Sequence, residues 1–466
     1  MSSPEITVYV PSQAYGAFLA DALASVFRQS RRDWELIVFD DGSTDETANV
    51  AETFRQRDPE RVRVVRNDTP RGLQYCANRA IEMARGKYVM RLDADDWLDD
   101  SALLVLAQVL DTRDDVGLVY PNYIYVDAAG RYLGTEFRKR AETEDALLDL
   151  AAHGACTMVR KRVLKSIGGY DESHRAQDGY ELWLKVLHRY GVANVSTPLF
   201  YYRQHDASLS RDDRRILNAR GKIKEKLADH LGAGPLRPDV LAVLPVKNTY
   251  RHMRDVALRP VAGKPLLDWT LDAALEAGCK DIIVTTDDER VVAHAQARGA
   301  IGLLRDSTLS EPDRRLAEVV LDAVERVERE RGFRPDAVAT LSVHSPLRTA
   351  DDLRRALQTL CLFDADTVIS VYEDFDLHFV HGKTGLAPLN PGMEKRLRLE
   401  REALYVFNGA LVISWRETMN ANGLFGSRVA HVTMARDDSL QTKSDYEIWL
   451  AEQQLLRRAA ETKGTG

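Results

Sequence analysis

The chain has 466 residues, of which 44% are hydrophobic and 29% are charged, and its formal net charge is -7 at pH 7. This composition is typical of a globular protein with two or three domains. The negative net charge argues against a general nucleic-acid binder. No run approaches the roughly 18 apolar residues of a membrane-spanning helix.

The first residues, "MSSPEITVYVPS", have neither the basic n-region nor the long apolar h-region of a secretory signal. We therefore expect a cytoplasmic protein, and peripheral association with a membrane stays open. The four cysteines, Cys76, Cys156, Cys279 and Cys361, are far apart and form no CxxC pair. This spacing favours reduced packing thiols over a disulfide framework or a zinc site.

Short β-rich segments alternate with helical patterns over the first hundred residues. The expected strands are 6–10, 34–41, 61–65 and 87–93, and the expected helices are 15–30, 45–56 and 73–84. This alternation predicts an α/β fold with a mainly parallel sheet covered by helices. Such sheets bind ligands beyond the carboxyl ends of their strands, where "FDDGSTD" and "LDADD" both fall. Two acidic clusters are therefore expected to face one crevice.

The pattern is interrupted at "LGAGPLRPD", where two glycines and two prolines separate a charged helix from a new apolar strand. Beyond it the alternation restarts, with strands expected at 240–246, 281–288, 337–343, 366–372 and 410–414 and helices at 265–278 and 313–331. We predict two α/β domains, residues 1–232 and residues 239–466.

The segment "RLDADDW" places Asp93, Asp95 and Asp96 at the end of a predicted strand. Packed carboxylates raise each other's pKa unless a cation or hydrogen-bond donors offset their charge. An enzyme that cleaves a nucleoside diphosphate from a sugar benefits from a divalent cation on the diphosphate oxygens, because their negative charge grows as the bond breaks. Alone, the pattern also fits a calcium loop or a solvated acidic turn.

The neighbouring motifs narrow this choice. "VYVPSQAYGAFLADALASVFRQSRRDWELIVFDDGSTDET" and "RGLQYCANRAIEMARGKYVMRLDADDW" resemble family 2 glycosyltransferases of the GT-A fold, and the resemblance covers about the first 210 residues. It implies Mg²⁺ or Mn²⁺ on Asp95. The residues that it implies at the nucleotide-sugar donor are Pro11, Asp40, Asp41, Arg71 and Asp93. After Pro11 the family usually has Thr-Tyr-Asn, whereas this chain has "SQA", which would alter nucleoside contacts.

Two later segments complete this resemblance. "GGYDESHRAQDGYELWLKVL" is similar to the segment that carries the family's general base, which takes the acceptor's hydroxyl proton in inverting transfer. Asp178 is the candidate catalytic base and Glu181 the second candidate, although charge at a helix N-terminus would explain either residue. "YYRQHDASLSR" resembles the segment over the diphosphate, which places His205 at the metal or a phosphate and Arg203 at the donor.

The second half, from "VLAVLPVKNTYRHMRDVALRPVAGKPLLDWTLDAALEAG" to "SDYEIWLAE", is similar to acylneuraminate cytidylyltransferases, which join CTP to a sugar acid. Their phosphate loop is rich in Gly, Ser, Lys and Arg. In this chain the loop reads Lys247, Asn248, Thr249, Tyr250, Arg251 and His252, without paired glycines to admit phosphate close to the backbone.

Gln441 and Lys443 align with positions where aspartates of that family hold a metal, and a lysine repels a cation. We therefore predict a catalytically degenerate domain. Its remaining pocket residues, which could also serve only the fold, are Lys247, Arg259, Lys264, Arg348 and Asn408.

Together these features predict two Rossmann-like nucleotide-binding α/β domains that form a metal-dependent inverting glycosyltransferase. The expected donor is a UDP-sugar, the cofactor Mn²⁺ or Mg²⁺, and the acceptor a hydroxyl of a glycan, a lipid-linked molecule or a small molecule. Two alternatives stay open: a bifunctional enzyme that also activates a sugar acid with CTP, and a non-catalytic nucleotide-sugar binder. A homodimer through the second domain also stays open, because the resembled cytidylyltransferases often pair there.

Overall fold

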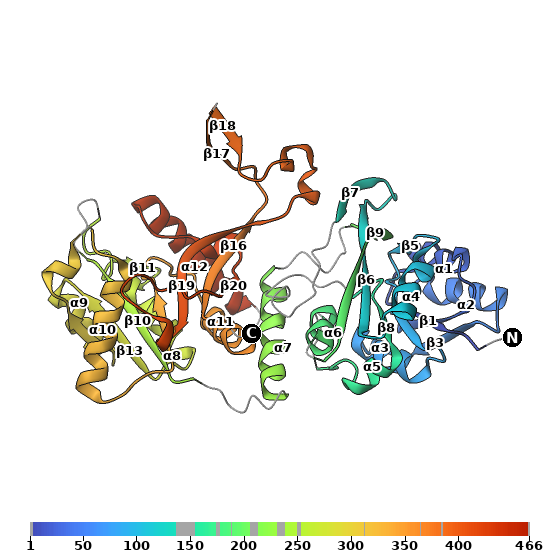
Figure 1. Ribbon diagram of the computed structural model, residues 1–466, viewed down its shortest axis with the longest axis horizontal. Helices are drawn as coiled ribbons and strands as arrows, with labels where there is room; N and C mark the ends of the chain where they lie inside the picture. Colours follow the sequence, from blue (N-terminus) through green and yellow to red (C-terminus); the bar gives the residue numbers. More distant parts are fainter. Residues whose placement is uncertain are drawn as a thin grey trace. The chain divides into compact units, whose positions relative to one another are not determined.

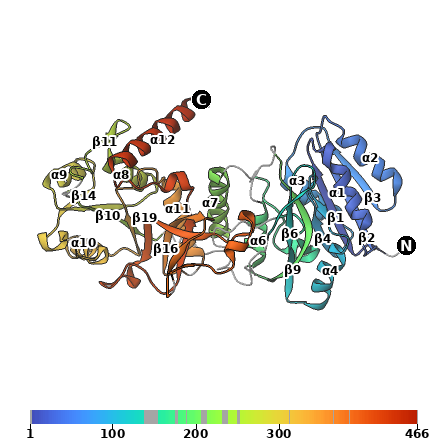
Figure 2. The same cartoon turned by 90° about the horizontal axis from the view of Figure 1, so that it is seen from above.

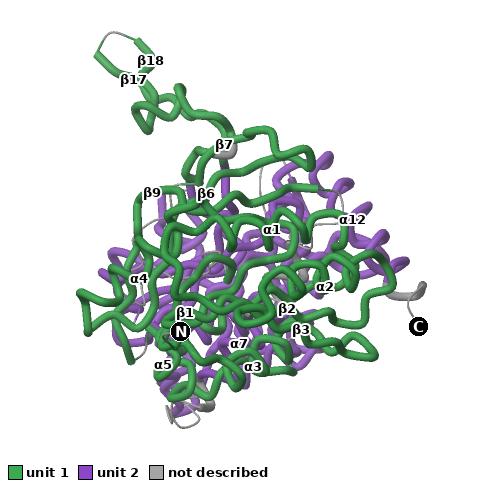
Figure 3. The backbone as a smooth tube through the Cα atoms, turned by 90° about the vertical axis from the view of Figure 1, so that its right-hand side faces the viewer, with its two compact units in different colours: residues 1–220, 375–402 green, residues 221–374, 403–466 purple. Residues whose placement is uncertain are grey.

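The structure is a computed structural model, and it divides into two compact units. It describes residues 3–136, 154–173, 178–187, 189–205, 213–230, 238–248, 253–311, 313–363, 365–383 and 385–464. Unit 1 comprises residues 1–220 and 375–402, and unit 2 comprises residues 221–374 and 403–466 (Figure 3). The predicted domain limits at 232 and 239 stay a prediction.

Unit 1 is built on a nine-stranded sheet in the order β3-β2-β1-β4-β8-β6-β9-β5, with β7 paired to β6 (Figure 1). The strands are β1 (Ile6–Ser12), β2 (Trp34–Asp41), β3 (Val62–Asn67), β4 (Tyr88–Arg91), β5 (Trp97–Leu98), β6 (Val116–Val126), β7 (Tyr132–Glu136), β8 (Met158–Arg160) and β9 (Gly191–Arg203). The helices are α1 (Gly16–Arg28), α2 (Thr47–Arg57), α3 (Leu73–Met83), α4 (Ala102–Thr112), α5 (Lys161–Ser166) and α6 (Asp178–Leu187). Helix α7 (Asp213–His230) begins in unit 1 and ends in unit 2.

The first four strands of this sheet are parallel, as predicted. β1 lies between β2 and β4, so the acidic segments that follow β2 and β4 leave the sheet at the same edge. The antiparallel strand β8 then joins β4 to the second half of the sheet. The α/β class expected from the sequence is confirmed.

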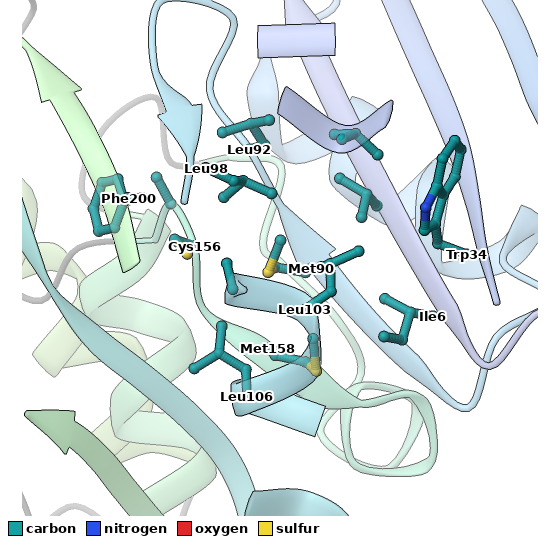
Figure 4. Packing of buried hydrophobic residues seen from close by; sticks show 14 of the residues in the cluster. Ile6, Trp34, Met90, Leu92, Leu98, Leu103, Leu106, Cys156, Met158 and Phe200 are labelled. Carbon is teal, nitrogen blue, oxygen red and sulfur yellow. The ribbon is translucent and has the colours of Figure 1, made fainter. Parts of the chain in front are cut away.

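The core of unit 1 forms where helices α1 and α4 cover the sheet. In α1, Leu19, Leu23 and Val26 recur at helical spacing and are fully buried, which explains why this segment folds as an amphipathic helix. Figure 4 shows Leu103 and Leu106 of α4 among the buried side chains near Met90 of β4 and Met158 of β8. This packing fixes the end of β4, from which the aspartates extend.

Unit 2 has a seven-stranded sheet in the order β14-β13-β10-β15-β19-β16-β20. The strands are β10 (Val240–Val246), β13 (Asp281–Thr286), β14 (Ile301–Leu304), β15 (Ala337–Leu341), β16 (Thr367–Asp374), β19 (Leu404–Trp415) and β20 (Val429–Thr433). The helices are α8 (Leu266–Glu276), α9 (Glu289–Ala297), α10 (Leu316–Arg331), α11 (Ala350–Leu362) and α12 (Asp445–Gly464). Figure 2 shows α10 on one side of this sheet and α8 and α11 on the other. Strand β19 is antiparallel to both of its neighbours.

Residues 375–402 lie in sequence between β16 and β19 but belong to unit 1. They include a small hairpin, β17 (Phe379–Gly382) and β18 (Gly385–Pro388). Near the end of the segment, Glu400 accepts hydrogen bonds from the Tyr132 hydroxyl at 2.7 Å and from the Thr135 backbone N–H at 3.2 Å. This arrangement could not be predicted from local sequence patterns, because the bonded residues are 268 and 265 positions apart.

No described helix is both long and apolar enough to cross a membrane. The four cysteines are free thiols, as the sequence predicts.

Candidate functional site

The candidate site lies at the carboxyl edge of the unit 1 sheet. Asp40 and Asp41 end β2, and the segment 93–96 follows β4 two positions after Arg91. In the register of the sheet, Ser12 of β1 pairs with Asp40, and Tyr9 of β1 pairs with Arg91. The fold therefore brings both acidic segments to one edge, with the end of β1, including Pro11, between them.

The carboxylate of Asp41 organises the loop that carries Arg71. It accepts hydrogen bonds from the backbone N–H groups of Arg71 and Gly72, both at 2.8 Å, and from the Asn67 side chain at 2.7 Å. Gly72 has a φ of 95°, a conformation that favours glycine. The Arg71 guanidinium lies 4.3 Å from the ring centroid of Tyr75. Asp41 is thus engaged by protein groups and places Arg71 at the site.

Asp40 has a similar local role. It is fully buried, and its Oδ1 accepts a hydrogen bond from the Ser43 backbone N–H at 3.0 Å. The Arg66 Nε lies 3.4 Å from its Oδ2. The carboxylate therefore stabilises the turn that leads from β2 towards α2.

The three aspartates of the second cluster have three different environments. Asp93 forms an ion pair with Arg91, with 2.8 Å between Oδ1 and Nε. Asp95 Oδ2 lies 3.1 Å from His205 Nε2. Asp96 is fully buried, and its Oδ1 accepts a hydrogen bond from the Arg203 backbone N–H at 2.9 Å.

The crowding of these carboxylates changes the pKa of neighbouring groups. Burial, together with the charges of Asp95 and Asp93, raises the pKa of Asp96 well above its usual range. Burial and the three aspartates also raise the pKa of Tyr15 to about 12. Burial and the neighbouring carboxylates therefore disfavour a negative charge on Asp96.

An aromatic clamp from α1 and the residue before it holds His205. Its ring stacks on Phe18, with centroids 5.2 Å apart, and meets the edge of Tyr15 at 5.9 Å. The sequence analysis missed both aromatic residues. They could have been found from their position shortly after the end of β1, because parallel sheets bind ligands beyond the carboxyl ends of their strands.

Arg203 fastens the end of β9 to the aspartate segment. Its Nε donates to the Asp95 carbonyl at 2.9 Å, one terminal nitrogen donates to the Ala128 carbonyl at 2.8 Å, and the other pairs with Asp21 at 2.8 Å. Its guanidinium also lies 4.7 Å from the ring centroid of Trp97. Arg203 therefore positions the backbone of the site through contacts within the protein.

The two candidate bases lie on α6. Asp178 is the first residue of this helix, and its side chain lies outside the described residues. Glu181 is 4% exposed, accepts a hydrogen bond from the Asp171 backbone N–H at 3.1 Å and pairs with Lys185 at 2.5 Å. These contacts give Glu181 a structural role. Trp183 is buried against Tyr120, as expected for a packing residue.

Asp95 and His205 are the two candidate metal ligands of the site. In the described part of the chain, no group of three or more His, Cys, Asp and Glu side chains is arranged to hold a metal ion. Asp95 nevertheless supplies a carboxylate, which suits Mg²⁺ and Mn²⁺, and His205 supplies an imidazole, which is a common ligand of transition-metal ions. Such a pair fits an ion whose remaining ligands come from substrate oxygens and water.

In unit 2 the start of the predicted phosphate loop is bonded to the protein itself. Lys247 Nζ donates to the Ser310 carbonyl at 2.6 Å. The side chain of Asn248 donates to Asp288 at 2.7 Å and accepts from the Ala257 backbone N–H at 3.1 Å. The remaining loop residues, Thr249, Tyr250, Arg251 and His252, lie outside the described residues.

The other basic residues predicted for this pocket are also paired. Arg259 forms an ion pair with Asp445, and Lys264 forms one with Asp272. The Lys264 ammonium also lies 3.7 Å from the ring centroid of Trp269. Each of these charges therefore has a partner within unit 2.

Asn408 and Arg348 are buried structural groups. Asn408 is 3% exposed, and its Nδ2 donates to the Ser439 hydroxyl at 2.9 Å. The backbone carbonyl of Asn408 accepts a hydrogen bond from the Gln441 side chain. Arg348 is also 3% exposed and donates to the Ala410 carbonyl at 2.8 Å, while burial lowers its pKa to about 10.

Comparisons with known families agree with this two-part organisation. Residues 7–168 match the model described as Glycosyl transferase family 2, and residues 254–372 match the model described as Cytidylyltransferase. Both resemblances expected from the sequence are confirmed. The chain carries a family 2 glycosyltransferase domain followed by a cytidylyltransferase domain.

Several curated proteins are similar to parts of the chain. It is 28% identical to the uncharacterized protein y4gI of Sinorhizobium fredii over 65% of its own length and 32% of that protein. It is 26% identical to the O-antigen biosynthesis protein RfbC of Myxococcus xanthus over 56% of its length and 20% of that protein. The chain thus spans about a third and a fifth of the lengths of these two relatives.

A third relative has an activity in its name. The chain is 24% identical to WfgD of Escherichia coli, a UDP-Glc:alpha-D-GlcNAc-diphosphoundecaprenol beta-1,3-glucosyltransferase, over 44% of its own length and 79% of that protein. Among solved structures, S. aureus TarS in complex with UDP-GlcNAc matches 86% of this chain and 99% of that chain at 15% identity, with a TM-score of 0.43. The family match and the named relatives support a role in glycosyl transfer.

Proposed function

We propose that this protein is a metal-dependent inverting glycosyltransferase that moves a sugar from a UDP-sugar to an acceptor hydroxyl. The observation that carries the proposal is the pair formed by Asp95 and His205 at the carboxyl edge of the unit 1 sheet. Asp93 lies two positions before Asp95 in the sequence. At the same edge of the sheet, Asp41 accepts a hydrogen bond from the backbone N–H of Arg71. The match to family 2 glycosyltransferases supports the reaction class.

In this proposal each side chain has one task. Asp95 and His205 would hold a Mn²⁺ or Mg²⁺ ion, and the ion would supply positive charge that stabilises the departing diphosphate. Asp93 contacts the ribose, and Arg71 lies beside the nucleotide. Arg203 acts as a positioning residue, because its guanidinium nitrogens bond to Asp95, Ala128 and Asp21.

We assign the general base to Asp178. An inverting transfer requires a carboxylate on the acceptor side to take the hydroxyl proton as the oxygen attacks the anomeric carbon. The contacts of Glu181 with Asp171 and Lys185 favour a structural role for that residue. Of the two candidates, we therefore favour Asp178.

For unit 2 we propose a domain that does not turn over CTP. Lys247, Arg259 and Lys264 are bonded to protein groups, and Lys443 stands where a metal-holding aspartate is expected. The match to the cytidylyltransferase model favours the alternative of a second activity. Incubation with CTP, Mg²⁺ and candidate sugar acids separates the two. Release of pyrophosphate that a substitution in unit 2 abolishes would establish the bifunctional enzyme.

The donor is tested by thermal shift of the full chain with UDP-, GDP-, dTDP- and CMP-sugars, with and without Mn²⁺. A ligand that binds only the native state raises the melting temperature. We expect the largest increase with a UDP-sugar and Mn²⁺ together. A larger increase with another nucleotide would reassign the donor, and an increase that does not depend on Mn²⁺ would contradict metal-dependent binding.

For the acceptor we propose a glycan or lipid-linked hydroxyl, which the similarity to WfgD supports.

A further inference from the structure

Unit 1 has a groove lined by residues outside the candidate functional site, which we name the basic groove. It has a volume of about 350 Å³ and is lined by Lys87, Tyr88, Arg160, Lys161, Arg162 and Lys165. Five of these six residues are basic and none is acidic, although the whole chain has a net charge of -7. The accessible walls of the groove are mostly the apolar stems of these side chains, so their charged ends lie around the rim. A concentration of positive charge at the rim of a groove in an acidic protein favours an anionic ligand there.

The basic groove is separate from the candidate active site. Tyr88 begins β4 and pairs in register with Arg160 of β8. The aspartate segment follows the other end of β4, after Arg91. The two sites therefore lie at opposite ends of the same strand.

Two of the basic side chains form a fixed wall. Lys87 pairs with Glu5 at 2.6 Å and with Asp111 at 2.8 Å. Arg160 is 8% exposed, and its Nε donates to the Val116 carbonyl at 2.8 Å. The Lys87 ammonium also lies 4.9 Å from the ring centroid of Tyr88. These contacts position part of the groove before any ligand arrives, which reduces the entropy cost of binding.

The other three basic side chains have no carboxylate partner in the part of the chain that the structure describes. Lys161 Nζ bonds to the Ala84 carbonyl. Arg162 and Lys165 are exposed, and they lie on one face of α5 because they are three positions apart. The charges of Arg162 and Lys165 are therefore available to an incoming anion, while Lys161 adds positive charge from a side chain that is already bonded to the backbone.

We propose that the basic groove binds the phosphate group of an anionic ligand. The planar guanidinium of Arg162 can donate two parallel hydrogen bonds to phosphate oxygens, while Lys161 and Lys165 act as point charges. A volume of about 350 Å³ lies at the small end of the range for ligand pockets. The ligand is either a soluble phosphate compound or the headgroup of a phospholipid, and the two share this chemistry.

The test uses the full chain without metal, in EDTA, at low ionic strength. Binding of inorganic pyrophosphate is measured by isothermal titration calorimetry. Flotation with vesicles of phosphatidylcholine alone or with phosphatidylglycerol measures the lipid source. The groove variant is Arg162→Glu with Lys165→Glu. The matched control is Arg55→Glu with Arg79→Glu, which changes the net charge equally at two half-exposed arginine side chains that pair with Glu52 and Glu82.

We expect the groove variant to bind the phosphate probe at least about tenfold more weakly than the wild type, and the control to lose less than about twofold. Binding of pyrophosphate would identify a soluble ligand, and binding only to vesicles with phosphatidylglycerol would identify a lipid headgroup. If the glutamates disturb folding, the milder variant Arg162→Gln with Lys165→Gln replaces the groove variant. It should also bind the phosphate probe more weakly than both the wild type and the control. Equal losses in the groove variant and the control, or no binding of either probe by the wild type, would overturn the proposal.

Discussion

The two units place polar side chains at the ends of similar strands but engage them differently. In unit 1, Asp95 and His205 meet at the carboxyl edge of the sheet, and Arg203 and the aromatic rings of Tyr15 and Phe18 hold them there. In unit 2, the polar side chains bond to other groups of the protein. Asn248, which follows β10, donates to Asp288, and Asn408 donates to Ser439. A shared architecture can thus present polar groups to a ligand or use them to stabilise the fold.

The largest expected effect in unit 1 is that of Asp178→Asn. Loss of a general base typically slows a reaction about 10²- to 10⁴-fold. We therefore expect kcat to fall by this factor while the KM for the donor is unchanged, measured by initial-rate transfer assays. The control Glu181→Gln should lower the melting temperature but keep the pH profile of kcat. If Glu181→Gln removed the acidic limb of that profile and Asp178→Asn did not, the base would be Glu181.

The next largest effect is expected for Asp95→Asn, which removes the charged partner of His205. We expect kcat/KM to fall at least about 10²-fold, the scale for removing one stabilising charge or donor from a transition state. The matched control is Asp100→Asn, an exposed aspartate nearby that pairs with Arg28. Full activity of Asp95→Asn in the presence of metal would show that the unit 1 site does not work as proposed.

A buried carboxylate far from the site tests the scaffold of unit 1. The Glu35 side chain is fully buried and accepts hydrogen bonds from Thr7 at 2.7 Å and from the Arg85 side chain at 2.6 Å. Glu35→Gln replaces hydrogen bonds to a buried charge with weaker ones, while the Arg85 side chain stays 48% exposed to water. The substitution should therefore lower the free energy of unfolding by about 1.5 to 3 kcal/mol. Urea unfolding at pH 7 measures this loss.

The same variant makes a prediction about pH. Burial alone would raise the pKa of Glu35, but the hydrogen bonds from Thr7 and Arg85 outweigh it and hold the pKa below its usual value. A lowered folded-state pKa contributes stability above the unfolded-state value of about 4.3, and this stability is lost as the pH falls through the folded-state pKa. The difference between wild type and Glu35→Gln should therefore shrink below about pH 4. A constant difference down to pH 2 would contradict this assignment.

The smallest effect is expected in unit 2, for Arg259→Ala. Its ion pair with Asp445 is exposed, with 40% and 81% of the two side chains accessible, and such pairs contribute less than about 1 kcal/mol. Transfer rates should stay within about twofold of wild type. A tenfold loss of transfer would mean that unit 2 takes part in the reaction and that the contrast between the units is wrong.

Local sequence patterns predicted the parallel core of unit 1 well. The strand expected at 34–41 is β2 without change, and the aspartates after β4 lie at the predicted edge. These features depend on alternation and apolar periodicity over short windows, which the sequence displays directly.

Long-range contacts could not be predicted in this way. Arg203 pairs with Asp21 across 182 positions, and Glu400 bonds to Tyr132 across 268 positions. The antiparallel insertion of β8 next to β4 and the assignment of residues 375–402 to unit 1 likewise depend on tertiary packing. The burial of Asp96 followed from the same packing, so its raised pKa was visible in sequence only as a general expectation for crowded carboxylates.

The most direct test is electron paramagnetic resonance of Mn²⁺ titrated into the full chain in the presence of UDP. The account predicts one bound ion per chain, with affinity reduced at least about tenfold in Asp95→Asn and in His205→Ala and unchanged in Asp100→Asn. Equal Mn²⁺ binding by all four proteins, together with product that still accumulates under chelation, would contradict it.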